Sequence, residues 1–220
     1  MTLFSIRTAV ALCLAASLAA CGGGSDKATF VVGGTVVGLA YSGLTLKTGD
    51  QSLAVAPVFS GTTPQNVPYA FPKTIDYGTA YTVTVETSPD KQNCGVVAFG
   101  TDGANRDSAG HTATINVQVN CSTKFYPLGG SVTGLTGTGL VLINGSVNSV
   151  AVAAAATSFT FPELPTYPAY VDQAYVVSVL TQPAGQTCTV QNGAGIMPNA
   201  AMTATSANAI AVTCVNNQAT

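Results

Sequence analysis

The only histidine of the chain, His111, stands in a short polar segment that also holds two aspartates. This segment, TDGANRDSAGH at residues 101–111, contains Asp102 and Asp107 among serine and threonine hydroxyls. Histidine, carboxylate and hydroxyl are the groups of a hydrolytic triad, and the oxygens of Asp102, Asn105 and Asp107 could ligate calcium. All of them fall in one hairpin-length loop, however. It has neither a strand-to-helix nucleophile turn nor the calcium-loop pattern with its closing glutamate.

We therefore expect this loop to be solvated and built of Asx turns, in a protein that is not an enzyme and holds no cofactor. The alternative is a small hydrolase or a calcium-dependent protein that uses the loop around Asp102, Asp107 and His111. Charge is scarce in the second half of the chain, where Glu163 and Asp172 are the only charged side chains after Pro127. Two isolated carboxylates are a poor supply of groups for general acid-base catalysis.

Four cysteines are spaced for two disulfides. Cys94 and Cys121 are 27 residues apart, and Cys188 and Cys214 are 26 residues apart. Of the three possible connectivities, only Cys94 to Cys121 with Cys188 to Cys214 keeps each bridge within its own half of the chain. A zinc site is not expected, because there is no CxxC motif and the second half has no histidine. Each bridge should stabilise its half by about 3 to 4 kcal/mol in the chain-entropy model.

Strands must position these residues, since the apolar residues recur with a period of two. Polar and apolar side chains alternate along residues 81–86, 114–121 and 210–214. The alanine run at 153–156 is too short and lacks the caps of a stable helix. About seven such runs, separated by turn residues, fill about 90 residues, which is typical of a two-sheet β-sandwich. The fold class is therefore all-β.

The chain contains one such unit twice, at a spacing of about 95 residues. GGTVVGLAYSGLTL matches GGSVTGLTGTGLVL, and AYTVTVETSPDKQNC matches AYVVSVLTQPAGQTC without a gap. We predict a first β-sandwich repeat over residues 28–122, a linker over 123–126 and a second repeat over 127–220. Each repeat would carry one of the two disulfides.

The N-terminus has the three regions of an export signal. Residues 1–8 carry one positive charge, and the apolar run of residues 9–20 is shorter than the roughly 20 residues that span a bilayer. Leu18-Ala19-Ala20-Cys21 resembles the lipobox of bacterial lipoproteins. The resemblance implies a signal peptide over 1–20 and a lipidated, acylated Cys21 that holds the protein in a membrane. An ordinary cleavage site before an incidental cysteine is the alternative. Residues 21–27 would form a Gly/Ser tether, and Gly22 after the cysteine implies the outer membrane.

Composition limits the partners. The chain is 47% hydrophobic and only 7% charged, with a net charge of −2 and no basic stripe, which excludes nucleic acid. Tyr167 and Tyr170 in PELPTYPAY, like Tyr69 and Phe71 in VPYAFP, could stack on a sugar or a peptide, or could instead cover the rim of the core. The expected partners are the membrane, through the lipid anchor, and another envelope protein or an extracellular ligand.

The repeat itself resembles one found in tandem in secreted and lipid-anchored proteins of Gram-negative bacteria. The second copy carries the pattern best, in residues 130–142, 159–161, 175–188 and 212–214. The resemblance implies a β module that faces the periplasm or the cell surface and brings no catalytic residues with it. The chain has no tryptophan, and its cysteines are too close in sequence for the antibody-type bridge. We therefore expect two tandem immunoglobulin-like or transthyretin-like β-sandwich domains.

Overall fold

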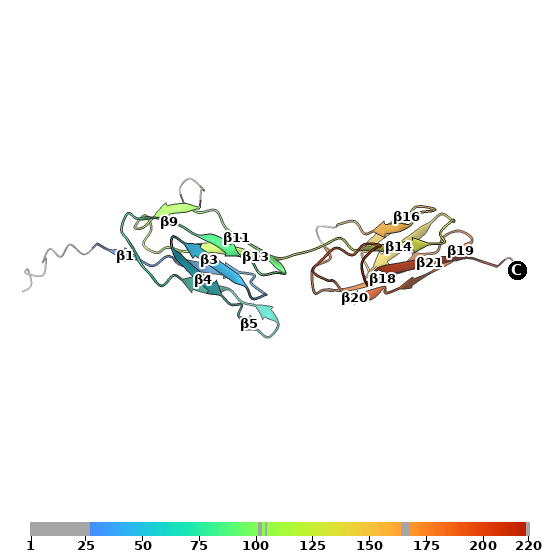
Figure 1. Ribbon diagram of the computed structural model, residues 1–220, viewed down its shortest axis with the longest axis horizontal. Coiled ribbons are helices and arrows are strands. Elements are labelled where there is room, and N and C mark those ends of the chain that lie inside the picture. The colour runs from blue at the N-terminus through green and yellow to red at the C-terminus, as the bar shows by residue number, and fades with distance from the viewer. Residues whose placement is uncertain (1–26, 101–102, 104, 164–167, 219–220) are drawn as a thin grey trace, which may run out of the picture.

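The computed structural model describes residues 27–100, 103, 105–163 and 168–218 (Figure 1). All regular secondary structure in these residues is β-strand, and they contain no helix. The buried hydrophobic residues form two separate clusters, one between Val32 and Val119 and the other between Leu128 and Cys214. We call residues 27–123 the first module and residues 127–218 the second module. The two lie end to end (Figure 1).

The first module has two main sheets, in the strand orders β11-β13-β2-β7 and β10-β3-β4. Three short pairs, β1 with β8, β9 with β12, and β5 with β6, complete it. The strands are β1 (Thr29–Phe30), β2 (Gly33–Val37), β3 (Leu44–Thr48), β4 (Gln51–Val55), β5 (Phe59–Ser60), β6 (Thr63–Pro64), β7 (Val67–Ala70), β8 (Ile75–Asp76), β9 (Ala80–Thr82), β10 (Thr84–Thr87), β11 (Gln92–Val96), β12 (Arg106–Ser108) and β13 (Val117–Thr123).

The second module has the same arrangement of two main sheets, in the strand orders β17-β14-β21-β19 and β16-β15-β18-β20. Its described strands all belong to these two sheets. In both modules the residues between the two main sheets form the core, which gives a sandwich-like structure. The strands are β14 (Gly129–Thr133), β15 (Leu140–Asn144), β16 (Asn148–Val152), β17 (Ser158–Thr160), β18 (Ala174–Thr181), β19 (Gln186–Gln191), β20 (Ala194–Ile196) and β21 (Ile210–Asn216).

A parallel strand pair at the same place identifies the two modules as copies of one topology. β2 pairs in parallel with β13, and β14 pairs in parallel with β21. A glycine makes this close pairing possible in each copy, because a Cβ on Gly34 would collide with the carbonyl oxygen of Val117. A Cβ on Gly130 would collide in the same way with that of Ile210. The sequence repeat therefore corresponds to a structural repeat.

The alternation predicted from the sequence is confirmed by burial. Residues 81, 83, 115, 117 and 119 are buried, while their neighbours at 82, 84, 114, 116 and 118 are exposed. The predicted disulfides are also confirmed, since Cys94 faces Cys121 across β11 and β13, and Cys188 faces Cys214 across β19 and β21. The alanine run at 153–156 forms a turn.

Each module also holds a buried glutamine next to its disulfide. The side chain of Gln92 is 1% exposed; its Oε1 accepts hydrogen bonds from the backbone N–H groups of Ala40 and Tyr41, and its Nε2 donates to the carbonyl of Gly38. Gln186 repeats this arrangement with Thr136, Gly137 and Gly134. The two glutamines therefore fix the loop that follows the first strand of each parallel pair.

The modules contact each other through a small polar cluster. Asp172 of the second module accepts a hydrogen bond from the Tyr41 hydroxyl at 3.0 Å and forms an ion pair with Lys91 at 2.7 Å. The segment that joins the modules, residues 123–126, is hydrogen-bonded to the second module. The Lys124 carbonyl accepts a hydrogen bond from the Val171 N–H, and the Tyr126 N–H donates one to the Ala169 carbonyl. Phe125 also packs edge-on against Tyr170.

Candidate functional site

The loop that holds His111 is partly a strand. Arg106–Ser108 form β12, which pairs with β9, so the expectation of a plain loop is wrong for these three residues. The His111 Nδ1 lies 3.2 Å from an Asp107 carboxylate oxygen, with the histidine side chain 54% exposed. Among the described residues no hydroxyl is hydrogen-bonded to the His111 ring, and Asp102 lies outside them.

Metal-binding groups do not gather in the part of the chain that the structure describes. No three His, Cys, Asp or Glu side chains there are close enough to share an ion. A site formed with Asp102 would include a residue outside that part. The calcium alternative therefore stays a sequence-based hypothesis.

The predicted aromatic contacts divide into two groups. Tyr69 and Phe71 belong to the core, with 7% and 2% of their surface exposed, and the Tyr69 hydroxyl donates to the carbonyl of Val117 at 2.9 Å. Burial raises the pKa of Tyr69 above its usual value. Tyr170 is half-buried and lines a pocket, whereas Tyr167 lies outside the described residues.

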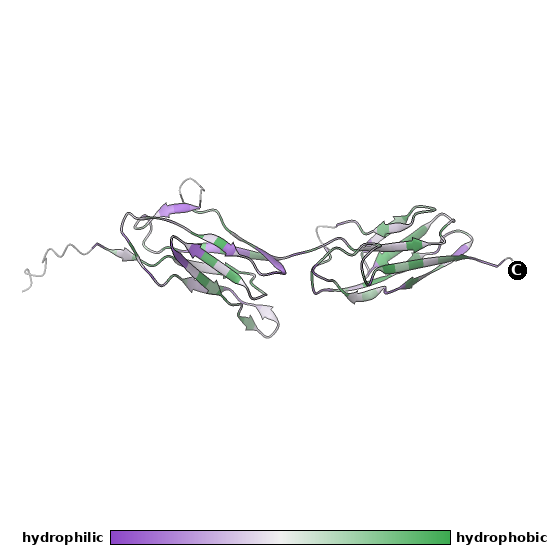
Figure 2. Cartoon of the chain, in the orientation of Figure 1, coloured by the Kyte–Doolittle hydropathy of each residue, from purple (hydrophilic) through white to green (hydrophobic). Residues whose placement is uncertain are grey.

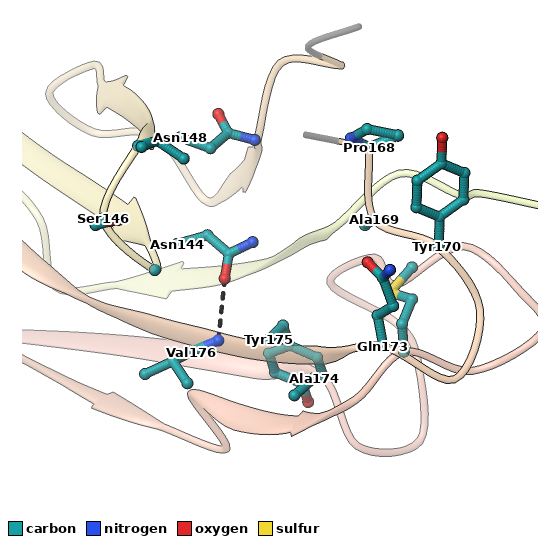
Figure 3. Close-up of a pocket in the computed structure, with 13 residues that line it drawn as sticks. Asn144, Ser146, Asn148, Pro168, Ala169, Tyr170, Gln173, Ala174, Tyr175 and Val176 are labelled. Atoms are coloured by element: carbon teal, nitrogen blue, oxygen red, sulfur yellow. Dashed lines mark hydrogen bonds between the residues drawn. The ribbon is translucent and has the colours of Figure 1, made fainter. Parts of the chain in front are cut away.

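This pocket opens at one end of the sheet formed by β16, β15, β18 and β20 and has a volume of about 470 Å³ (Figure 3). Three segments enclose it: the turn from β15 to β16, the chain leading into β18, and the residue after β20. The lining residues are Asn144, Gly145, Ser146, Val147, Asn148, Pro168, Ala169, Tyr170, Gln173, Ala174, Tyr175, Val176 and Met197.

Hydrogen bonds to the backbone of β18 and of the segment before it hold the pocket walls in place. The Asn144 Oδ1 accepts from the Val176 N–H at 3.0 Å, and the Gly145 N–H donates to the Val176 carbonyl at 2.8 Å. The Met197 N–H donates to the Gln173 carbonyl at 2.8 Å. The turn, β18 and the end of β20 therefore form one framework around the cavity, and the amide side chains of Asn144 and Gln173 face the space between them (Figure 3).

One charged side chain, Asp50, stands in the first module where the pocket has Ser146. Asn148 begins β16 as Gln51 begins β4, and Gln51 exchanges two hydrogen bonds with the backbone of Lys73. The Lys73 ammonium in turn pairs with Asp50 at 2.6 Å, which holds the pKa of that carboxyl below its usual value. In the second module the short turn with Asp50 is replaced by one that contains Ser146 and Val147.

The outer face of the same sheet is the second candidate surface. We use this name for the side chains of β16, β15, β18 and β20 that point away from the core. Val176, Leu180 and Ile196 are 55%, 56% and 60% exposed on it. The outer face consists of Val141, Ile143, Ser149, Ala151, Ala174, Val176, Ser178, Leu180, Ala194 and Ile196.

Polar or charged residues stand at eight of the ten matched positions of the first module, and alanines stand at the other two. Lys47 on β3 stands at the position of Ile143 on β15. Glu86 on β10 stands at the position of Leu180 on β18, at a β-bulge that both modules share. Lys47 and Glu86 lie 3.6 Å apart as an ion pair. The whole matched set is Thr45, Lys47, Ser52, Ala54, Ala80, Thr82, Thr84, Glu86, Arg106 and Ser108. Figure 2 shows hydrophilic positions on the strands of the first module and mainly apolar or neutral ones on those of the second.

From the sequence, Tyr170 was named as a candidate ligand contact, and it lines the pocket. The other pocket residues and the residues of the outer face were not identified. The signal for the outer face was present, because residues 174–181 read AYVVSVLT and carry apolar side chains on both faces of the strand. No local signal marks the pocket, since its walls come from three segments far apart in the sequence. The only sequence signal for the role of Gln92 and Gln186 is that glutamine stands at the same position in both repeats.

The described part of the chain contains no helix with the length and hydrophobicity needed to cross a bilayer. No protein-family model matches this chain, and no curated protein matches it either.

Proposed function

We propose that this chain is a lipid-anchored protein of the cell envelope that performs no catalysis and binds a partner protein through the outer face of its second module. The two modules would be immunoglobulin-like or transthyretin-like domains. The lipobox-like residues up to Cys21 support the anchor, and two disulfides are typical of proteins folded outside the cytoplasm.

The contrast between the two outer faces carries the proposal. The same fold solvates its face with Lys47, Glu86 and Arg106 in one copy and exposes Val176, Leu180 and Ile196 in the other. Nothing in the fold requires those apolar residues, because the first module forms the same strands without them. Exposed apolar sheet faces are typical of contact surfaces.

The chemistry of the face defines the partner. It carries no charged side chain, so a charged partner surface would lose its hydration without gaining a counter-charge. We therefore expect a partner that presents an uncharged apolar surface. Four strands about 4.8 Å apart give a face of roughly 400 Å². This is less than the about 800 Å² per partner of a stable interface, so the contact is transient or extends beyond the sheet.

Photocrosslinking in cells tests the proposal. A photoreactive residue at Val176 should give one discrete adduct with another envelope protein, identified by mass spectrometry, and one at the matched Thr82 should give none. Ile143→Lys combined with Leu180→Glu should abolish the adduct. This variant introduces the ion pair that Lys47 and Glu86 already form in the first module. Exchanging Lys47 and Glu86 is the matched control and should leave the adduct intact.

Two outcomes would contradict this function. Equal labelling from positions 176 and 82 would show that the outer face has no special role. An adduct with the mass of two copies of this chain would replace the envelope partner with self-association. Protease treatment of intact cells that carry a C-terminal tag would also show which side of the membrane the modules face. Loss of the tag indicates the surface, and its protection indicates the periplasm.

A further inference from the structure

We infer that the pocket between the β15–β16 turn and the start of β18 binds an uncharged, hydroxyl-rich ligand, namely a sugar residue. The pocket adjoins the outer face and shares Ala174 and Val176 with it, but Ile143 and Leu180 of that face do not line the pocket. Its volume of about 470 Å³ lies within the range of about 300 to 1,000 Å³ that is usual for small-molecule sites.

The ligand should be uncharged because none of the described residues that line the pocket is Asp, Glu, Lys, Arg or His. The nearest acidic residue in the sequence, Asp172, is already bound by Lys91 and Tyr41 at the contact between the modules. An anion or cation in the pocket would therefore meet no opposite charge.

The polar groups of the pocket can both donate and accept hydrogen bonds, as sugar hydroxyls do. The Oδ1 of Asn144 is occupied by the Val176 N–H, which leaves its Nδ2 as a donor toward the pocket. The amide of Gln173 faces it from the opposite side and offers an acceptor and a donor, and Ser146 adds a hydroxyl (Figure 3).

Apolar groups complete the wall against which the C–H face of a sugar ring could pack. Tyr175 and Met197 form the deep part, with 7% and 1% of their surface exposed. At the rim, the Tyr170 ring is held edge-on by Phe125, with ring centroids 6.1 Å apart. A ring already fixed by a neighbour loses little conformational freedom on binding.

The first module lacks this chemistry. Asp50, which pairs with Lys73, stands where the second module has Ser146, and Thr79 stands where the second module has Gln173. The duplication therefore supplies an internal control, because a sugar that binds for these reasons binds the second module alone.

Nuclear magnetic resonance titration of the two-module chain tests the site. Glucose, galactose and N-acetylglucosamine are the probes, while acetate and triglycine are the charged and peptide controls. We expect shifts from at least one sugar that concentrate at Asn144, Ser146, Gln173 and Tyr175, with affinities near the millimolar range. Gln173→Ala should lower the affinity about tenfold, and the matched Thr79→Ala should leave it unchanged.

Three results would overturn the inference: no shift at the pocket with any sugar, an equal response to triglycine or acetate, or an unchanged affinity in Gln173→Ala. Ile143→Lys with Leu180→Glu should bind the sugar normally, because neither residue lines the pocket. Failure of the partner contact and failure of the sugar site are therefore distinguished by the same set of variants.

Discussion

The two modules share one fold and differ mainly in what they expose. Both have the same parallel strand pair, a disulfide at matched positions and a buried glutamine beside it. The first covers its outer face with polar and charged groups, and the second leaves apolar side chains on the same strands. The core, the disulfide and the buried glutamine therefore specify the architecture, while the side chains of the outer face can differ without altering it.

The largest expected effect is the loss of stability on removing a disulfide, a feature that both modules share. Replacing both cysteines of one bridge by alanine should lower the free energy of unfolding of that module by about 3 to 4 kcal/mol. The loss should be similar for the Cys94–Cys121 and Cys188–Cys214 bridges, because they close segments of 27 and 26 residues. Urea denaturation of each double variant, followed separately for each module, measures it.

The two disulfides should differ in how fast they are reduced. Cys94 and Cys121 are half-buried, whereas Cys188 and Cys214 are 3% and 5% exposed. Access limits thiol–disulfide exchange, so dithiothreitol should open the bridge of the first module faster. Equal rates, or faster opening in the second module, would show that burial does not protect that bridge.

The buried glutamines should give the next largest effect. Gln92→Ala leaves the N–H groups of Ala40 and Tyr41 without their acceptor, and Gln186→Ala does the same to Thr136 and Gly137. Each change should cost about 2 to 3 kcal/mol of stability, measured by thermal and urea unfolding.

The exposed Gln118→Ala and Gln191→Ala are the matched controls and should change stability by less than about 0.5 kcal/mol. Only Gln92→Ala should also loosen the contact between the modules, since Tyr41 takes part in it. A loss in Gln92→Ala no larger than in Gln118→Ala would remove the loop-fixing role.

Local sequence patterns predicted the strands and the disulfides, but they did not predict how the strands pair or which residues form the pocket and the outer face. Alternation along residues 115–121 identifies a strand because one face is buried, and cysteines at matched places in a repeat limit the pairing. The pairing of β2 with β13 joins segments more than 80 residues apart, and no local pattern encodes such a contact. β18 breaks the alternation by exposing Val176 and Leu180, so its outer face cannot be told from its inner one by period alone.

The smallest effect concerns the orientation of the modules. The Lys91 ammonium hydrogen-bonded to Asp172, together with the Tyr41 hydroxyl, holds the pKa of that carboxyl below its usual value, and the same hydrogen bond raises the pKa of Lys91. The pair is therefore charged at neutral pH and is lost only as the pH falls through the lowered carboxyl pKa or rises through the raised lysine pKa. We expect the relative orientation, measured by residual dipolar couplings, to stay constant from about pH 5 to about pH 9.

Asp172→Asn removes the charge but keeps a residue that tolerates the positive φ of 63° at this position. This variant should widen the range of orientations and remove their dependence on salt, with little change in stability, because exposed ion pairs contribute little. Glu163→Gln, the other charged position of the second module, is the control and should change neither. If Asp172→Asn leaves the couplings unchanged, then Phe125 packed on Tyr170 and the backbone bonds of residues 124–126 fix the orientation instead. The second module would then present its pocket and its outer face at an angle that does not depend on charge.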